Sequence, residues 1–320
     1  MTALILSGSN NIYLAKTDEG EILECRLKGK VLKGAEGFYN PIAPGDRVVL
    51  SVGDTNEGEA LITGLSERRN VYARWNQKGN APQLLASNLD LILCVVTPAS
   101  PPFRPRFLDR ALLQGDIAGI PPVIVLNKCD LDFTADTDGF DADAAERLED
   151  FRRIGYRILR VSALSGLGLE ELRELIGGRT GAMVGQSGVG KSSLLNALSP
   201  GLALRTGELC AKFDRGSHTT TMARLIAIDA PRGGGFIVDT PGVRRLVPDG
   251  TNAAELASHF REFAPIVGTC TFGASCSHET EPGCRIMEAV AAGLIHEDRY
   301  ESYLRIKEEL AERLPAYRKS

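Results

Sequence analysis

The residues Gly185-Gln186-Ser187-Gly188-Val189-Gly190-Lys191-Ser192 decide the fold of this chain. They match the pattern G-x-x-x-x-G-K-[ST], in which glycines let backbone N–H groups turn inward around phosphate oxygens. An apolar run, 181–184, precedes them and a helix-compatible stretch, 193–198, follows, which is the strand–loop–helix context that the pattern requires. Lys191 would then reach the β and γ phosphates, and the Ser192 hydroxyl would bind Mg²⁺. The stretch predicts a nucleotide phosphate loop, and a chance match is the less favoured alternative.

Apolar strand-like runs alternate with helical stretches on both sides of this loop, from about residue 71 to residue 247. The runs are 89–96, 123–126, 157–161, 181–184 and 236–238. Such alternation is typical of βα units around a parallel sheet. The sequence therefore predicts an α/β domain over 71–247.

Two further regions flank the α/β region. Residues 1–70 contain short alternating runs separated by Gly, Pro and Asp, which favour a small β-barrel, although a small sandwich has the same periodicity. Residues 248–320 begin with a stretch expected to be helical, 253–263, and continue through a Cys/His-rich stretch to a charged helix, 297–314. We therefore expect three domains: 1–70, 71–247 and 248–320.

The composition restricts the class of protein. A length of 320 residues exceeds one ordinary domain, and 43% apolar with 24% charged residues is typical of a soluble globular protein. No apolar run is long enough to span a bilayer, and residues 1–6 lack the basic start and apolar core of a signal peptide. We therefore expect a cytoplasmic protein without a membrane partner. The net charge of −4 does not by itself indicate a nucleic-acid partner.

Asn127-Lys128-Cys129-Asp130 follows the run 123–126 and predicts guanine as the bound base. The Asp130 carboxylate can accept from N1–H and the 2-amino group of guanine, whereas adenine offers neither donor. Asn127 would tie this loop to the phosphate loop, and the Lys128 stem would cover the purine. Ser162-Ala163-Leu164 follows the next run, where backbone commonly contacts guanine O6. Each pattern alone fits an ordinary solvated turn, but together they support a guanine site.

Two motifs are the expected switch elements: His218-Thr219-Thr220-Thr221 and Asp239-Thr240-Pro241-Gly242. Asp239 would hold Mg²⁺ through water, and the Gly242 N–H would sense the γ-phosphate. One threonine, for which we take Thr220, would complete the Mg²⁺ shell. The choice among the three threonines stays open, and a plain polar loop is the alternative. The usual two-state mechanism orders both loops around the γ-phosphate and releases them on hydrolysis.

Val243 follows Gly242, at a position where many small GTPases carry a water-positioning glutamine. Valine cannot orient water, so either hydrolysis is slow or another group acts. His218 is the nearest polar candidate in sequence, and an imidazole can orient or deprotonate water near neutral pH. We therefore expect His218 and Lys191 to be the catalytic residues.

The order of these motifs is circularly permuted. In an ordinary small GTPase the phosphate loop comes first and the base-reading elements come last, whereas here 127–130 and 162–164 precede 185–192 and 239–242. The sheet can still close, because rejoining the termini elsewhere keeps its contacts. The chain that leaves the second switch runs directly into the cysteine-rich region, so movement of this loop can reach a C-terminal domain.

Three of the seven cysteines gather beside a histidine, in the order Cys270, Cys276, His278 and Cys284. Three thiolates and an imidazole suit one structural Zn²⁺ in a closed tetrahedral set, with no open position for catalysis. In a reducing compartment this pattern favours a metal site over disulfides. The alternative is three unliganded thiols and a surface histidine, and the spacing is not one of the common finger spacings.

Together these residues resemble the bacterial ribosome small-subunit-dependent GTPase A family. The resemblance covers most of the chain and includes the permuted order, the phosphate loop with Ser193, both switch motifs and the Cys/His cluster. It implies an N-terminal OB-type barrel, a central permuted P-loop GTPase domain and a C-terminal helical zinc domain. It also implies GTP hydrolysis stimulated by the 30S subunit, late 30S maturation, and contact with 16S rRNA.

The resemblance assigns residues as well. It carries the zinc ligands onto the four Cys/His residues and the hydrolytic role onto His218. With the motifs, the expected site for GTP or GDP with Mg²⁺ comprises Asn127, Lys128, Asp130, Ser162, Ala163, Gly185, Gln186, Ser187, Gly188, Val189, Gly190, Lys191, Ser192, Ser193, Thr220, Asp239 and Gly242. Nothing in the sequence suggests more than a monomer.

The sequence departs from the family in its charge. Many members carry a basic N-terminal extension, whereas this sequence starts almost at the expected barrel, and its first 70 residues have a net charge of −2. Contact with rRNA would need a local patch, for which Arg26, Lys28, Lys30 and Lys33 form the best cluster. A solvated strand edge explains the same residues equally well.

Two other functions compete with ribosome assembly. One is a nucleotide-gated module that binds a non-ribosomal RNA through the barrel. The other is a GTPase that delivers zinc from the Cys/His cluster, which a closed ligand set disfavours because released metal needs an exchangeable site.

Overall fold

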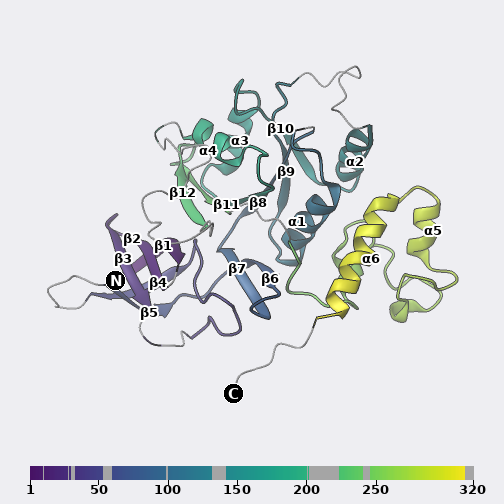
Figure 1. The fold of residues 1–320 in the computed structure, drawn as a ribbon, viewed down its shortest axis with the longest axis horizontal. Coiled ribbons are helices and arrows are strands. Elements are labelled where there is room, and N and C mark those ends of the chain that lie inside the picture. Colours follow the sequence, from purple (N-terminus) through teal and green to yellow (C-terminus); the bar gives the residue numbers. More distant parts are fainter. Residues whose placement is uncertain are drawn as a thin grey trace.

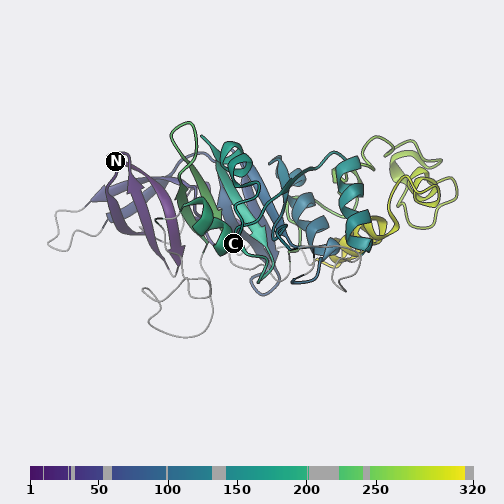
Figure 2. The same ribbon diagram turned by 90° about the horizontal axis from the view of Figure 1, so that it is seen from above.

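The computed structural model describes residues 1–9, 11–27, 29, 33–52, 60–98, 100–131, 142–199, 201, 223–240 and 246–313. These residues form a barrel, a central α/β body and a C-terminal helical part that lie in a row (Figures 1 and 2). Among them, no helix combines the length and the apolar character needed to cross a bilayer.

The N-terminal part is a five-stranded barrel, as predicted. Its strands are β1 (Thr2–Ser9), β2 (Ile12–Thr17), β3 (Ile22–Leu27), β4 (Arg47–Val52) and β5 (Ala60–Leu65). They pair in the order β1-β2-β3-β5-β4, and a β1–β4 pairing closes the circle. Alternate residues such as Ala3 and Ile5 of β1 point into the barrel and are fully buried, because side chains of a strand alternate between its two faces.

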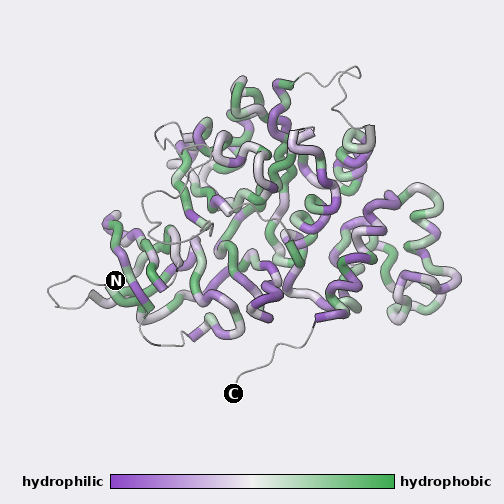
Figure 3. Tube along the Cα trace, in the orientation of Figure 1, coloured by the Kyte–Doolittle hydropathy of each residue, from purple (hydrophilic) through white to green (hydrophobic). Residues whose placement is uncertain are grey.

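The central sheet has strand order β10-β9-β8-β11-β13-β12. Neighbouring strands are parallel except β12, which is antiparallel to β13. The strands are β8 (Leu91–Val96), β9 (Pro122–Leu126), β10 (Arg157–Arg160), β11 (Thr180–Gly185), β12 (Arg224–Ile228) and β13 (Gly235–Asp239). Figure 3, in the orientation of Figure 1, shows hydrophobic stretches in the central body as well as in the barrel.

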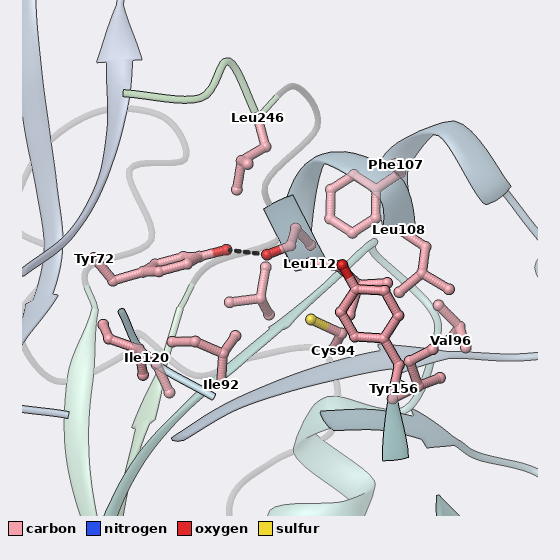
Figure 4. Close-up of a cluster of buried hydrophobic side chains, with 14 of the residues drawn as sticks. Tyr72, Ile92, Cys94, Val96, Phe107, Leu108, Leu112, Ile120, Tyr156 and Leu246 are labelled. Carbon is pink, nitrogen blue, oxygen red and sulfur yellow. Dashed lines mark hydrogen bonds between the residues drawn. The ribbon is translucent and has the colours of Figure 1, made fainter. Parts of the chain in front are cut away.

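The central sheet is covered on both faces, which explains its continuous apolar runs. Every residue of β8 is buried: Ile92, Cys94 and Val96 join one core cluster and Leu91, Leu93 and Val95 join the other. The first cluster packs against α1 (Pro105–Ile117) and α2 (Ala142–Arg153), and Figure 4 shows part of it. The second packs against α3 (Leu169–Ile176) and α4 (Lys191–Leu198).

Two features of the central part were not predicted. An antiparallel hairpin, β6 (Val71–Asn76) and β7 (Ala81–Ser87), precedes the parallel strands, and the Tyr72 hydroxyl at its base donates to the carbonyl of Ala111 in α1 at 3.4 Å. The barrel also joins the central sheet, because β1 pairs with β12 at Ser7 and Arg224. A single sheet of 11 strands therefore runs through both parts.

Over residues 246–313, the C-terminal part contains two α-helices, α5 (Arg285–Ala291) and α6 (Glu297–Ala311), and two short 3₁₀ turns, η2 (Leu256–His259) and η3 (Gly273–Ser275). The α-helix expected over 253–263 is wrong, since only η2 forms there. Phe260 adopts an extended backbone, which lets its ring stack on Phe263 with centroids 4.9 Å apart. Both rings meet Tyr303 of α6 edge-on, so tertiary packing overrides the helical propensity of this segment.

Candidate nucleotide and metal sites

The phosphate loop lies between β11 and α4, at the carboxyl end of the central sheet. Gly188 and Gly190 have φ angles of 84° and 90°, in the left-handed region that glycine tolerates. A Cβ atom at Gly190 would lie 2.4 Å from Asn127 Nδ2, so a side chain there would displace the neighbouring loop. These glycines let the backbone turn closely into the N-terminus of α4, where N–H groups can bind an anion.

Lys191 and Asp239 lie together beneath this loop. The Lys191 ammonium donates to the carbonyls of Gly185 at 2.7 Å and Gln186 at 3.0 Å. Burial lowers the pKa of Lys191, and the nearby Asp239 carboxylate opposes this by raising it. Burial raises the pKa of Asp239 to about 6, against the lowering effect of Lys191.

Asp239 also has an unpaired oxygen. Its Oδ1 is buried and makes no hydrogen bond to any described residue. A buried carboxylate oxygen without a partner is costly, and a hydrated Mg²⁺ ion beside a phosphate supplies the charge and the donors that it lacks. The Asp239 environment therefore fits the Mg²⁺ that accompanies a nucleotide.

Asn127 connects three loops that come from different parts of the chain. It is 1% exposed, its Nδ2 donates to the Val189 carbonyl at 2.9 Å, and its Oδ1 accepts from the Ala163 N–H at 3.3 Å. The amide thus joins the loop expected to read the base to the phosphate loop and to the segment after β10. The structure brings together the three elements that the sequence placed at strand ends.

Asp130 is oriented by the side chain of Ser162, whereas the sequence predicted only a backbone contribution from this residue. The Ser162 hydroxyl donates to Asp130 Oδ1 at 2.5 Å and accepts from the N–H groups of Leu164 at 3.1 Å and Ser165 at 3.0 Å. Ser162 is fully buried, so its hydroxyl has a fixed direction. The side chain of Ser162 therefore holds the carboxylate expected to read guanine, in addition to any contact that its backbone makes.

A proline-rich stretch, described over 97–98 and 100–104, supports the site and was missed from the sequence. The Lys128 ammonium donates to the Ser100 carbonyl at 2.6 Å, and the Thr97 hydroxyl donates to the Pro101 carbonyl at 2.7 Å. A Cβ at Gly188 would lie 3.7 Å from Pro101 Cδ, so this loop also touches the phosphate loop. Its position directly after β8, which is adjacent to β11 in the sheet, is the signal that could have identified it.

Several expected site residues lie outside the described part of the chain. They are His218, Thr219, Thr220, Thr221, Pro241, Gly242 and Val243, together with Lys28 and Lys30 of the basic cluster. Ser192 and Ser193 are in the first turn of α4, and both are half-buried.

The C-terminal cysteines and histidine form one buried cluster. Cys270, Cys276, His278 and Cys284 each offer one ligand atom, and these atoms all lie within 4.8 Å of one another. His278 Nδ1 lies 3.6 Å from Cys270 Sγ and 3.5 Å from Cys284 Sγ. Thiolates held at about 2.3 Å around a tetrahedral Zn²⁺ ion are separated by similar distances. The cluster therefore fits one metal ion of this kind.

Helix α6 supports the loop that carries His278. The Tyr300 hydroxyl donates to the His278 carbonyl at 2.7 Å, and the Tyr303 hydroxyl donates to the Ser277 carbonyl at 3.2 Å. The Lys307 ammonium donates to the same Ser277 carbonyl at 2.5 Å. These contacts hold the backbone of the loop that carries His278, so the four side chains are kept in an arrangement that could hold a metal ion.

Comparison with known proteins agrees with this geometry. Residues 65–247 match the family model described as RsgA GTPase. A protein from Bacteroides fragilis named small ribosomal subunit biogenesis GTPase RsgA is 35% identical over 318 residues, which cover 98% of each chain. A protein of the same name from Moorella thermoacetica is 40% identical over 304 residues, or 95% of each chain.

Two solved structures share the fold. The crystal structure of YjeQ from Thermotoga maritima matches with a TM-score of 0.70 and 33% identity, covering 98% of this chain and 99% of that one. The structure of YloQ, described as a circularly permuted GTPase, matches with a TM-score of 0.64 and 27% identity over 99% and 96% of the two chains. The motifs, the fold and these matches show that this chain belongs to the RsgA GTPase family and is a P-loop enzyme that hydrolyses GTP.

Proposed function

We propose that this GTPase binds the small ribosomal subunit and acts in late 30S maturation, with hydrolysis of GTP to GDP and phosphate stimulated by the subunit. The observation that carries the proposal is the match along almost the whole chain to relatives named for small ribosomal subunit biogenesis. We further propose that the protein works in the cytoplasm as a monomer and contacts 16S rRNA. Arg26 and Lys33 of the basic cluster are exposed, which supports such a contact.

The nucleotide site supports a division of roles. Backbone N–H groups over Gly185–Ser193 would hold the phosphates, Lys191 would neutralise the β and γ phosphates, and Ser192 would bind Mg²⁺. Asp130, held by Ser162, would accept from the guanine edge. Because Asp239 Oδ1 is buried and has no hydrogen-bond partner among the described residues, it would hold the hydration shell of the ion.

For hydrolysis we retain the proposal that His218 orients or deprotonates the attacking water. The water oxygen would form a bond to the γ-phosphorus while the bond from that phosphorus to the β–γ bridging oxygen breaks, so that GDP leaves with the bond electrons. Thr220 would complete the Mg²⁺ shell, and the Gly242 N–H would sense the γ-phosphate.

At the C-terminal cluster we propose one structural Zn²⁺ bound by Cys270, Cys276, His278 and Cys284. All four residues are buried, and α6 holds the backbone of the ligand loop, which supports metal retention over metal delivery. We also propose that the domains span residues 1–70, 71–247 and 248–320.

Steady-state GTP hydrolysis tests the proposed function. The rate is measured for the purified protein alone, with 30S subunits, and with 50S subunits as the control. We expect strong stimulation by 30S subunits and none by 50S subunits. Equal rates in all three conditions, with normal GTP binding, would refute the ribosomal role and favour a module that binds another RNA.

A further inference from the structure

The segment Leu246–Asp249, which we call the exit segment, follows the second switch motif. Five residues separate it from Thr240, whose hydroxyl donates to the Met183 carbonyl at 2.8 Å. The exit segment forms no helix or strand, yet Leu246, Val247 and Pro248 are buried. Leu246 packs beside Tyr72 and Phe107 in the core (Figure 4). An irregular buried segment needs partners for its backbone polar groups.

Other elements supply these partners one by one. Four consecutive carbonyls accept from four different residues: Leu246 from Arg110 Nη1 at 3.4 Å, Val247 from the Trp75 N–H at 3.0 Å, Pro248 from Arg313 Nη2, and Asp249 from Gln114 Nε2 at 3.2 Å. Gln114 also accepts from the Asp249 N–H at 2.6 Å, so one buried amide binds both backbone groups of that residue. The exit segment is therefore fixed by α1, β6 and the end of α6.

Residues in α6 or just beyond it make or support two of these four contacts. Arg110 makes a bidentate ion pair with Glu309 of α6, with N–O distances of 2.7 and 2.9 Å. Arg313, just beyond α6, lies 3.7 Å from Asp249 and has its guanidinium 4.9 Å from the centre of the Trp75 ring. The pKa of Arg313 is lowered by burial, while Asp249 and Glu309 oppose this. Arg110, Glu309 and Arg313 thus connect the C-terminal part to the chain that leaves the second switch.

We infer that Arg110 is a positioning residue for GTP hydrolysis, which acts through the Leu246 carbonyl and is itself held by Glu309. An anchored exit segment limits the arrangements of the preceding switch and lowers the entropy cost of its ordering around the γ-phosphate. A partner that binds α6 would affect the second switch through Glu309, Arg110 and the Leu246 carbonyl. The inference rests on the proposed placement of that switch at 239–242.

An exposed ion pair between the same two helices provides a matched control. Arg106 of α1 and Glu301 of α6 form an ion pair at 2.7 Å, with side chains 50% and 46% exposed. The corresponding values for Arg110 and Glu309 are 15% and 23%. Within the described part of the chain, no hydrogen bond or ion pair joins Arg106 or Glu301 to the exit segment. Loss of the Glu301 carboxylate therefore weakens the docking of α6 without acting on the exit segment.

The experiment compares Glu309→Gln with Glu301→Gln in the full-length, metal-loaded protein without ribosomes. Single-turnover hydrolysis of GTP and the Kd for GDP are measured for both variants, and hydrogen exchange is followed in peptides that cover 246–250. For Glu309→Gln we expect hydrolysis to slow by about fivefold with unchanged GDP affinity, because loss of one charged hydrogen bond has an effect of this order. Exchange at the Asp249 amide should also rise. Glu301→Gln should match the unmodified protein in all three measurements.

Each outcome decides the inference. Slower hydrolysis in Glu309→Gln alone, reproduced by Arg110→Lys, supports it. Equal slowing in both glutamine variants would show a general effect of α6 docking and overturn it, as would faster exchange at 246–250 with an unchanged hydrolysis rate. The assay contains no ribosomal subunit, so failure of the proposed ribosomal role would leave its result intact.

Discussion

The side-chain amide of Asn127 donates to the carbonyl of Val189 at 2.9 Å across 62 residues of sequence. This bond joins the loop expected to read the base to the loop expected to hold the phosphates. The same amide accepts from the Ala163 N–H, so one buried side chain fixes the relative positions of three ligand loops. Binding of the base and binding of the phosphates should therefore depend on each other.

Replacement of Asn127 tests this dependence. Asn127→Ala leaves the Val189 carbonyl and the Ala163 N–H without their partner, at a cost of about 1–3 kcal/mol for each buried group. We expect the Kd for GDP to rise by about tenfold to a hundredfold, measured with a fluorescent GDP analogue. Asn76→Ala, at the β6–β7 turn, is the control and should bind GDP normally. Unchanged affinity in Asn127→Ala would show that the three loops are held by other contacts.

Base specificity should depend on the Asp130 carboxylate. Asp130→Asn replaces an acceptor of two guanine N–H groups by an amide, which can instead donate to the 2-oxo group of xanthine. We expect GDP affinity to fall by about a hundredfold or more and affinity for xanthosine diphosphate to rise. Ser162→Ala should have a smaller effect of about threefold to tenfold on GDP, because it leaves the carboxylate in place and removes the 2.5 Å bond that orients it, together with the bonds that the hydroxyl accepts from the Leu164 and Ser165 N–H groups. Competition binding with both nucleotides distinguishes these outcomes.

The raised pKa of Asp239 predicts a pH-dependent stability of the nucleotide-free protein. Burial raises this pKa from 3.8 to about 6, so the folded state binds the proton more tightly than the unfolded state does. The contribution of Asp239 to the free energy of unfolding is therefore most favourable below about pH 4. It falls as the pH rises towards about 6. Asp239→Asn removes the titration, and we expect it to stabilise the apo protein by about 1–3 kcal/mol at pH 8, with a smaller gain at pH 5. Urea unfolding at both pH values provides the measurement, and a gain independent of pH would assign the effect to another cause.

Metal content tests the C-terminal cluster. Cys284→Ser removes one of the four proposed ligands, and we expect the bound zinc to fall from about one ion per chain to nearly none. Since ligand binding is coupled to folding, α5 and the loop around His278 should lose protection from hydrogen exchange. Cys129→Ser, a half-buried cysteine outside the cluster, should keep its zinc. Full zinc content in Cys284→Ser would contradict the assignment of this ligand.

The buried Asp109 should contribute far more to stability than surface ion pairs between the same parts. Asp109 is fully buried and accepts from Arg147 at 3.1 Å, Arg299 at 2.9 Å and the Ser302 hydroxyl at 2.5 Å. Asp109→Ala leaves two buried guanidinium groups without this partner, and we expect a loss of about 3–5 kcal/mol in urea unfolding. Arg106→Ala breaks an exposed pair and should cost at most about 1 kcal/mol. Similar losses in the two variants would mean that the buried arginines find other partners.

Local patterns in the sequence predicted most of the fold. Alternation of apolar residues predicted the barrel, and the apolar runs at 89–96 and 123–126 predicted the parallel sheet, in which they form β8 and β9. The predictions failed where packing decides the conformation. Residues 253–263 have the composition of a helix, yet Phe260 and Phe263 leave helical geometry to reach Tyr303. The β6–β7 hairpin was not predicted, because its stability depends on contacts such as that of Tyr72 with α1.

The sequence by itself was enough to predict the chemistry of the ligands. Recognition of phosphate, guanine and metal each needs a few residue types at short spacing, so a contiguous pattern such as 185–192 or 127–130 is sufficient to indicate it. Only the tertiary structure decided how these ligand loops are held and connected. The bond from Arg299 to Asp109 spans 190 residues, and that from Gln114 to Asp249 spans 135. No local pattern encodes such pairs, because they arise only when folding brings distant elements into contact and buried polar groups must find partners.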